Sequence, residues 1–210
     1  MRDDERVSQT HRLVYIRHGE TAWSRAGRHT GATDVPLTET GEEQARALGP
    51  VLEGLALSRP TVLVSPRARA ATTAELAGLT VTAVDPDLAE WDYGDYEGRT
   101  SAEIRVDDPG WTVWTAGAPG GESPEQVTAR VDRVLDRARG AMADGDVVLV
   151  AHGHLGRVLT ARFLRQPLEF GRNVMILPAS AAVFGYDRDA VPQLTRFGLT
   201  GYAAAHYTGR

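Results

Sequence analysis

The chain of 210 residues contains no cysteine and no lysine. Without cysteine it has no disulfide bond, no thiolate metal site and no cysteine nucleophile. Without lysine it has no Schiff-base chemistry and no phosphate-binding lysine of the P-loop kind. All 23 cationic side chains are therefore arginines. These two absences exclude several classes of enzyme before any motif is considered.

Long apolar runs are also missing. Residues 1–12 are polar and mixed in charge and lack the apolar segment of a secretory signal, and no later stretch is long enough to span a membrane. The net charge of −5 argues against nucleic acid as the main partner, because phosphate backbones bind basic surfaces. We therefore expect a cytoplasmic protein with no membrane or nucleic-acid partner.

The length fits one sizeable core, and neither repeats nor linkers are visible, so residues 1–210 are predicted to form a single domain. Residues 1–11 and 202–210 are expected to be tails, the first of them flexible. Between them, short apolar runs alternate with helical patterns. This alternation predicts an α/β fold, a three-layer α/β/α sandwich around a mostly parallel sheet.

The expected strands cover residues 13–16, 61–64, 81–84 and 146–150, with a closing pair at 181–186 and 193–197. A helix is expected behind Thr38 or Thr40, and Pro50 should kink or shorten it. Two more helices are expected, at 70–79 and behind a capping box at Ser123. Residues 90–121 hold three of the four tryptophans and read as a long, ordered excursion.

Two histidines occupy matching positions in this pattern. His18 and His152 each follow a predicted strand directly, and each precedes a glycine. In open α/β sheets, ligands bind beyond the carboxyl ends of the strands, so both imidazoles could face one pocket although 134 positions separate them. The alternative is that they are two unrelated loop histidines, which either residue alone would favour.

Arginines accompany these histidines. Arg17 precedes His18, and Arg67 and Arg69 follow the second strand in the segment SPRAR. Guanidinium groups match the geometry of phosphate oxygens, so a phosphate pocket with a histidine nucleophile is indicated. An acid must then protonate the leaving oxygen, and Glu90 and Asp92 are the candidates.

The segment LVYIRHGETAWSRAGRHTGATDVPLTETG resembles the signature of the histidine phosphatase superfamily, in its phosphoglycerate mutase-like branch. The segments SPRARAATTAEL, AEWDYGDYEG, GGES and VLVAHGH follow in the order that this family shows. The resemblance extends from about Leu13 to Gly201. It implies a phosphoglycerate mutase-like fold, no cofactor and no metal. Because relatives are often dimers, a homodimer is one expectation.

The resemblance also implies roles for individual residues. His18 would be the nucleophile that is transiently phosphorylated, with Arg17, Arg69 and His152 completing the phosphate pocket. Glu90 would be the proton donor and then the base. The implied substrate-binding residues are Thr21, Ser24, Thr30, Gly31, Tyr93 and Gly153.

Some of these residues have simpler interpretations. Thr30 and Gly31 could be turn residues only, and Tyr93, like Trp91, could anchor the core. His154 forms a His-x-His pair with His152, but no carboxylate or cysteine cluster nearby supports a metal site. His11, His29 and His206 are expected at the surface or in the tails.

The family contains both mutases and phosphatases, and the chain departs from the mutase pattern. His154 stands where those mutases have asparagine, Ser101 replaces a substrate-binding lysine, and no arginine pair lies between Thr100 and Gly121. A mutase needs such fixed cations to retain its intermediate while it reorients. The sequence therefore favours a phosphatase acting on a small phosphorylated metabolite or sugar phosphate. A bisphosphoglycerate-dependent mutase is the alternative, and a non-catalytic phosphate-binding module or a metal-dependent hydrolase is less favoured.

Overall fold

The computed structural model describes residues 11–202. It has six strands, β1 (Leu13–Arg17), β2 (Thr61–Val64), β3 (Ala83–Val84), β4 (Val147–Ala151), β5 (Ala181–Tyr186) and β6 (Pro192–Leu199). The α-helices are α1 (Ala22–Arg25), α2 (Glu39–Gly54), α3 (Ala68–Leu76), α4 (Ser101–Asp107), α5 (Val113–Ala116), α6 (Pro124–Ala141) and α7 (Gly153–Phe163). Short 3₁₀ turns cover Pro86–Leu88, Gly94–Tyr96 and Leu168–Asn173. The expected tails lie almost entirely outside the described residues.

The strands form one sheet in the order β3-β2-β4-β1-β5-β6. The first four of these are parallel, and β5 and β6 are antiparallel additions, which confirms a mostly parallel sheet. β5 pairs with both β1 and β6, so it is an interior strand and only β6 forms that edge. In register, Ile16 lies beside Val150, and Val150 lies beside Val64. The carboxyl ends of β1, β4 and β2 therefore lie level at one edge of the sheet.

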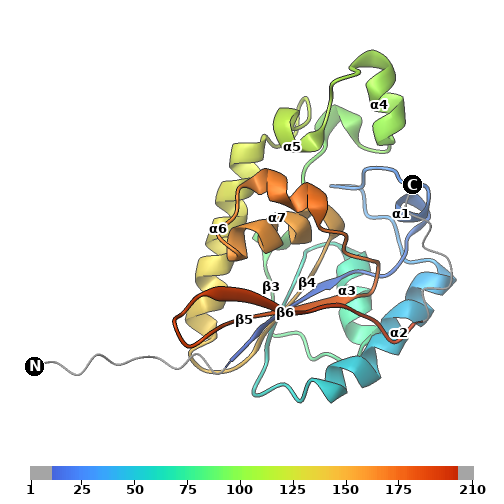
Figure 1. The fold of residues 1–210 in the computed structure, drawn as a ribbon. Helices are drawn as coiled ribbons and strands as arrows, with labels where there is room; N and C mark the ends of the chain where they lie inside the picture. The colour runs from blue at the N-terminus through green and yellow to red at the C-terminus, as the bar shows by residue number, and fades with distance from the viewer. Residues whose placement is uncertain (1–10, 203–210) are drawn as a thin grey trace, which may run out of the picture.

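Helices cover both faces of the sheet (Figure 1). Alternate residues of each central strand point to opposite faces. Tyr15 and Leu149 join the core beneath α6 and α7, whereas Ile16 and Val150 join the core beneath α2 and α3. Because both faces are buried, the strands are continuous apolar runs rather than alternating ones. This arrangement confirms the three-layer sandwich.

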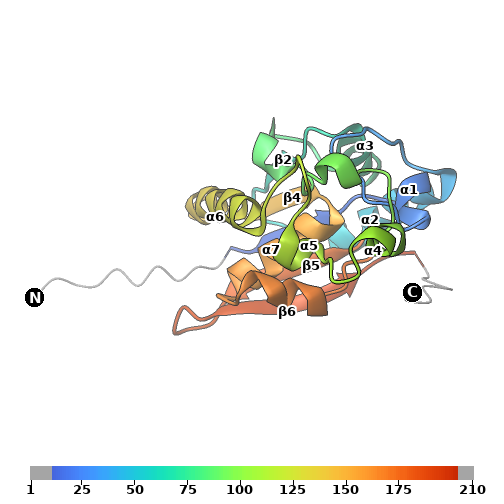
Figure 2. The same cartoon turned by 90° about the horizontal axis from the view of Figure 1, so that it is seen from above.

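Residues 90–121 stand above the sheet and carry α4 and α5. Figure 1 shows this excursion at the top of the molecule, and Figure 2, seen from above, shows α4 and α5 in front of α7. Trp91, Trp111 and Trp114 are all buried, and they continue the core that lies under α6 and α7. The excursion is ordered by these rings, as the sequence predicted.

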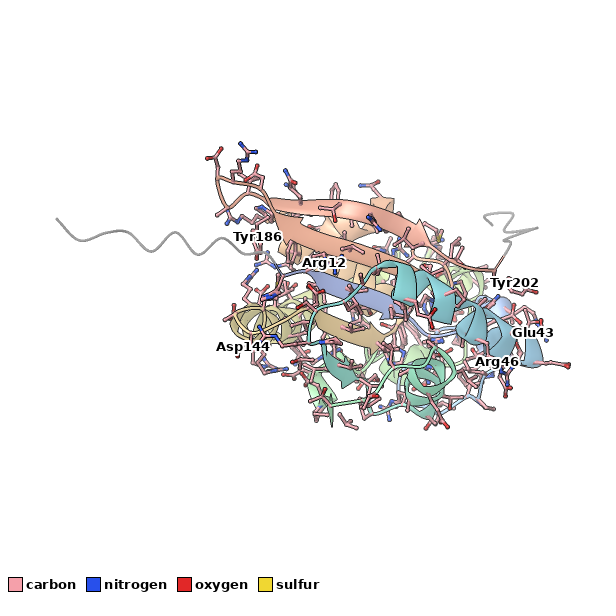
Figure 3. The ribbon with its side chains drawn as sticks, turned by 90° about the horizontal axis from the view of Figure 1, so that it is seen from below. Arg12, Glu43, Arg46, Asp144, Tyr186 and Tyr202 are labelled. Carbon is pink, nitrogen blue, oxygen red and sulfur yellow. The ribbon has the colours of Figure 1, made fainter. Side chains whose placement is uncertain are left out.

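An ion pair fastens the sheet at the end opposite the level strand ends. Arg12 precedes β1 and Asp146 precedes β4, and the Arg12 Nη2 atom lies 2.7 Å from Oδ2 of Asp146, whose side chain is buried. The Arg12 amide donates to the same carboxylate at 2.6 Å. Figure 3 shows Arg12 at one end of the molecule and Glu43 and Arg46 of α2 at the other. The pair thus helps to fix the relative register of the two strands that precede His18 and His152.

Local details differ from the sequence expectations. The helix that begins behind Thr38 continues four residues beyond Pro50, so of the two expected effects of the proline, a kink or a shortening, the shortening does not occur. Leu48 and Leu52 are buried on either side of the proline, and their packing holds both turns in place. The helix predicted at 70–79 ends at Leu76, because Gly78 adopts φ +75° and turns the chain away. The third strand is limited to Ala83–Val84.

Within residues 11–202, we find no helix with the length and apolar character needed to cross a membrane.

We predict that Gly156→Ala destabilises the protein by about 1–3 kcal/mol, because overpacking a rigid core costs that much. A Cβ at this position would lie 2.3 Å from Cε1 of the buried Tyr15 ring and 2.8 Å from Cδ1 of Ile176. Denaturant unfolding measures the change. The matched control is Gly140→Ala in α6, where a Cβ meets no atom within 4 Å. This control should stabilise by roughly 0.5–1 kcal/mol through helix propensity, and equal effects of the two variants would contradict the packing argument.

Candidate active site

The level strand ends bring His18 and His152 together. The His18 amide donates to the carbonyl of Ala151, the last residue of β4, at 2.9 Å, so His18 and His152 lie side by side. Their ring centroids are 5.2 Å apart in an edge-on arrangement. Ser65 follows β2 at the same edge, and its amide donates to Val150 at 3.0 Å. The two histidines that the sequence placed at matching positions therefore form one site.

His18 is a neutral ring whose Nδ1 is bonded to the backbone, so that its Nε2 carries the lone pair. Its Nδ1 lies 2.7 Å from the carbonyl oxygen of Gly19, which can only accept, so Nδ1 carries the proton. Burial lowers the pKa of His18 well below its usual value, and the charges of Arg17 and Arg69 add to this, against the opposing Gly19 hydrogen bond. In the neutral ring the lone pair is on Nε2. This is the state required of a nucleophile.

His152 is buried, and a hydrogen-bond relay determines where its proton lies. The Arg67 amide donates to Oγ of Ser65 at 3.3 Å, and this oxygen lies 2.7 Å from Nε2 of His152. The relay is complete when the Ser65 hydroxyl donates to Nε2, which leaves the proton of His152 on Nδ1. Nδ1 is buried and has no hydrogen-bond partner among the described residues. The ring is thereby set to donate to an incoming oxygen.

The arginines surround these rings. Arg69 is fully buried, and its terminal nitrogens donate to the carbonyls of Thr30, Gly31 and Thr33 at 2.9–3.2 Å. The Nε atoms of Arg69 and Arg67 are buried and make no hydrogen bond with any described residue. Arg17 donates to the carbonyl of Ile176 at 2.7 Å.

Buried polar groups are normally satisfied, so buried nitrogen donors gathered in one place indicate an anion with several oxygens. Both arginines and His152 supply such donors, and a phosphoryl group has the oxygens to meet them.

Glu90 approaches from the excursion and lies at the start of α7. Its carboxylate accepts three backbone N–H groups, from Trp91 at 2.9 Å, Leu155 at 2.8 Å and His154 at 3.0 Å. His152 is the residue that precedes this helix, yet its side chain makes no capping bond. Glu90 therefore caps the helix in its place, and the first turn of α7 holds the carboxylate. The other acid candidate, Asp92, is exposed.

The implied substrate-binding residues lie in several elements. Thr21 and Ser24 bond each other in a capping box at the start of α1, with their hydroxyls engaged there. Thr30 and Gly31 lie in the loop whose carbonyls bind Arg69. A Cβ on Gly31 would lie 2.9 Å from the Trp91 carbonyl oxygen, and one on Gly153 would lie 3.3 Å from the Arg17 guanidinium. Gly31 and Gly153 thus permit close packing at the site.

An aromatic cluster of Tyr93, His29, His154 and Trp111 adjoins Glu90. Tyr93 is almost completely buried, and its hydroxyl lies 2.7 Å from Nδ1 of His154. His29 was expected at the surface, and this prediction is wrong. It is buried, its ring stacks on Tyr93 with centroids 4.6 Å apart, and its Nε2 lies 3.1 Å from Oγ of Ser101. The excursion folds over this loop histidine, which the local sequence does not reveal.

No cluster of three or more histidine, aspartate or glutamate side chains within residues 11–202 could hold a metal ion. His154 instead bonds Tyr93.

Sequence reasoning missed Ser65 and Tyr15. The Tyr15 hydroxyl donates to the His152 carbonyl at 2.7 Å and accepts from the His152 amide at 2.9 Å, so it clamps that residue from β1. Ser65 could have been found, because it is the first residue after a strand at the edge where both histidines were placed. Tyr15 carries no such signal, since it reads as one more core residue of an apolar run.

Comparison with known proteins agrees with this geometry. A model of the histidine phosphatase superfamily, branch 1, matches residues 13–200. The chain is 48% identical to an acid phosphatase of Mycobacterium tuberculosis over 92% of its own length and 95% of the relative. It is 34% identical to a sedoheptulose 1,7-bisphosphatase of Saccharomyces cerevisiae, over 88% and 78% of the two chains. A solved structure of an open reading frame from Mycobacterium tuberculosis superposes with a TM-score of 0.90 at 48% identity, over 92% and 100% of the chains.

We predict that the protein loses stability as the pH falls from about 6.5 to 4, partly through His29. Burial, aided by the charge of Arg105, lowers the pKa of His29 to about 4. Because the unfolded chain binds this proton near pH 6.5, the contribution is fully present above that pH and is lost on acidification, by about 3 kcal/mol in total. Urea unfolding of the protein and of His29→Phe across this range checks it. The variant should show a shallower decline, and parallel curves would contradict the assignment.

Proposed function

Because the chain belongs to branch 1 of the histidine phosphatase superfamily and is a phosphatase, we propose that it hydrolyses small phosphate monoesters through a phosphohistidine at His18, without a metal. The observation that carries this proposal is the neutral His18 ring beside His152, Arg67 and Arg69. These three residues supply buried nitrogen donors that make no hydrogen bond with any described residue and that fit the oxygens of an anion. A phosphate monoester supplies both the electrophile for the ring and the oxygens for the donors.

In the first half-reaction, Nε2 of His18 attacks phosphorus and a P–N bond forms while the P–O bond to the leaving group breaks. The leaving oxygen takes its proton from the protonated Glu90 carboxyl. Arg17, Arg69 and Nδ1 of His152 stabilise the charge on the remaining phosphoryl oxygens. Nδ1 of His18 keeps its proton throughout, bonded to the Gly19 carbonyl, so the ring becomes positively charged as the P–N bond forms.

In the second half-reaction, water attacks the phosphohistidine. The Glu90 carboxylate removes a proton from the water as the new P–O bond forms and the P–N bond breaks. This step returns His18 to its neutral form, returns Glu90 to its protonated form and yields inorganic phosphate. One carboxyl group therefore serves as acid and then as base, which requires that it be held at a fixed place near the phosphorus.

The substrate class of this proposal is a small phosphorylated metabolite or sugar phosphate. It is supported by the relatives named as an acid phosphatase and a sedoheptulose bisphosphatase. Such phosphate esters are charged and do not cross membranes readily, so the proposal places the enzyme in the cytoplasm. It includes no nucleic-acid or membrane partner, in keeping with the net charge of −5.

The mutase alternative lacks support from the surroundings of the site. Ser101, which stands in place of a lysine, bonds His29 through its hydroxyl. Arg105, in the excursion, donates to the Trp111 carbonyl at 3.0 Å. Ser101 carries no charge, and Arg105 is a single arginine where the mutases have a pair that retains the monophosphate while it reorients.

We predict that His18→Asn lowers kcat for a chromogenic monophosphate ester by roughly 10³-fold or more, because the nucleophile is lost. Rapid quenching of the unmodified enzyme with labelled substrate should trap phosphate in an acid-labile, base-stable linkage that the variant lacks. The matched control is His11→Asn, which replaces a histidine that bonds the Met142 carbonyl. Retained turnover in His18→Asn would overturn the nucleophile assignment.

A second prediction separates hydrolysis from isomerisation. With 3-phosphoglycerate and 2,3-bisphosphoglycerate present, we expect release of inorganic phosphate without formation of 2-phosphoglycerate, and no effect of a chelator. Phosphate release and isomer composition can be followed in one sample by phosphorus NMR. Efficient isomerisation with little net hydrolysis would restore the mutase alternative, and inhibition by the chelator would refute the metal-free mechanism.

A further inference from the structure

A buried arginine of α6 binds the backbone on which Glu90 is mounted. Nη1 of Arg130 donates to the carbonyl oxygens of Asp87 and Ala89, both at 2.7 Å. Its Nη2 donates to the carbonyl of Glu90 itself at 3.2 Å. Arg130 is only 9% exposed, and one guanidinium thus collects three carbonyls of the segment that ends at Glu90.

Glu122, from the segment GGES, completes this arrangement on the other side of Glu90. Its carboxylate accepts from Nε of Arg130 at 2.7 Å and also from Nη2 of Arg130. The same carboxylate accepts the Asp92 amide at 3.0 Å, and the Glu122 carbonyl accepts the Trp91 indole N–H at 3.0 Å. The ion pair therefore binds the chain both before and after Glu90.

These contacts are unlike those of a pair that only stabilises the fold. Burying an ion pair has a large unfavourable free energy of desolvation, so the pair is often no more stabilising than apolar side chains of the same size. Here the two side chains make four hydrogen bonds to backbone groups of residues 87–92 around one carboxyl group, and two more to each other. Neither residue touches His18 or His152 in any described contact.

We propose that Arg130 and Glu122 are positioning residues for the general acid and base. The inference rests on the proposed function, in which Glu90 gives a proton to the leaving oxygen and later takes one from water. The α7 amides hold the carboxylate of Glu90, and the Arg130–Glu122 ion pair holds the backbone on either side of it. Loosening the backbone moves the carboxyl group relative to the leaving oxygen, while the phosphate donors stay in place.

This role predicts a dependence on the leaving group that a structural role does not. An alkoxide is a poor leaving group and needs the proton of Glu90 as the P–O bond breaks. A nitrophenolate is stable without a proton and depends on that acid much less. A displaced Glu90 therefore slows phosphoryl transfer to His18 far more for alkyl phosphates than for aryl phosphates. The water step is the same for both, and kcat/KM reports the first transfer without it.

The test compares kcat and KM for p-nitrophenyl phosphate and for glycerol 3-phosphate in Arg130→Met and Arg130→Lys. We expect kcat/KM for glycerol 3-phosphate to fall by about 10²-fold and kcat/KM for p-nitrophenyl phosphate by less than about 10-fold in Arg130→Met. Arg130→Lys keeps the positive charge beside Glu122 and should therefore fold, but it lacks the planar guanidinium that donates to several carbonyls at once. It should show the same selectivity to a smaller degree.

The matched control is Arg162→Met, which removes an arginine of α7 that forms an ion pair with Asp132 of α6 at 2.9 Å, with no described contact to residues 87–92. It should affect both substrates equally. Equal losses of kcat/KM on both substrates in Arg130→Met, with the fold retained by circular dichroism, would overturn the inference.

Glu90→Gln separates this inference from the proposed function. A loss in Glu90→Gln that is selective for the alkyl phosphate, with none in the Arg130 variants, would refute the positioning role while leaving the acid role intact. Unchanged activity of Glu90→Gln on glycerol 3-phosphate would refute the acid role and the positioning role together.

Discussion

The parallel register of β1, β4 and β2 is the constraint on which the rest of the molecule depends. It places the residues that follow the three strands at one level, so that His18, His152 and Ser65 meet although they are far apart in sequence. A shift of one residue in any pairing would turn these side chains to the other face of the sheet. The register is enforced by apolar cores on both faces and by the Arg12–Asp146 pair at the opposite end. The same strand register is therefore required both for packing the core and for assembling the site.

The site combines strong positive charge with neutral imidazoles. Burial lowers the pKa of His152, as it does that of His18, and neighbouring charges add to the effect. A histidine in such surroundings keeps its lone pair at neutral pH, while the arginines keep their charge. The same guanidinium groups that would stabilise a phosphoryl group thus also keep His18, the proposed nucleophile, unprotonated. In the proposed mechanism this coupling supplies His18 in its reactive form without a metal.

The sequence predicted the fold class, the mostly parallel sheet and the meeting of the two histidines, because strand ends and hydrophobic runs are local signals. It did not reveal Tyr15 as the clamp on His152 or Arg130 as a partner of the Glu90 backbone. Both look like ordinary members of a buried run or a polar helix, and their roles depend on which side chains other elements bring to them. His29 was misjudged for the same reason, since burial by the excursion is a tertiary effect. At Pro50, local propensity was overruled by the packing of Leu48 and Leu52.

At the start of α7 the helix amides bind a side-chain carboxylate, and other groups are left to bind phosphate. A helix N-terminus is a natural binding place for an anion, and in many enzymes phosphate occupies it. Here Glu90 takes that place by accepting the amides of His154 and Leu155, and His152 lies immediately before the same helix. In the proposed mechanism guanidinium and imidazole donors therefore bind the phosphate, while the helix holds the acid. The amides of His154 and Leu155 that bind Glu90 and the histidine beside His18 all lie at the start of α7. The packing of this helix against β1 through Gly156 and Tyr15 therefore helps to fix the distance between Glu90 and His18. Arg130 ties the excursion that supplies Glu90 to α6, so the two residues that act in the proposed mechanism, Glu90 and His18, are held by one packed unit.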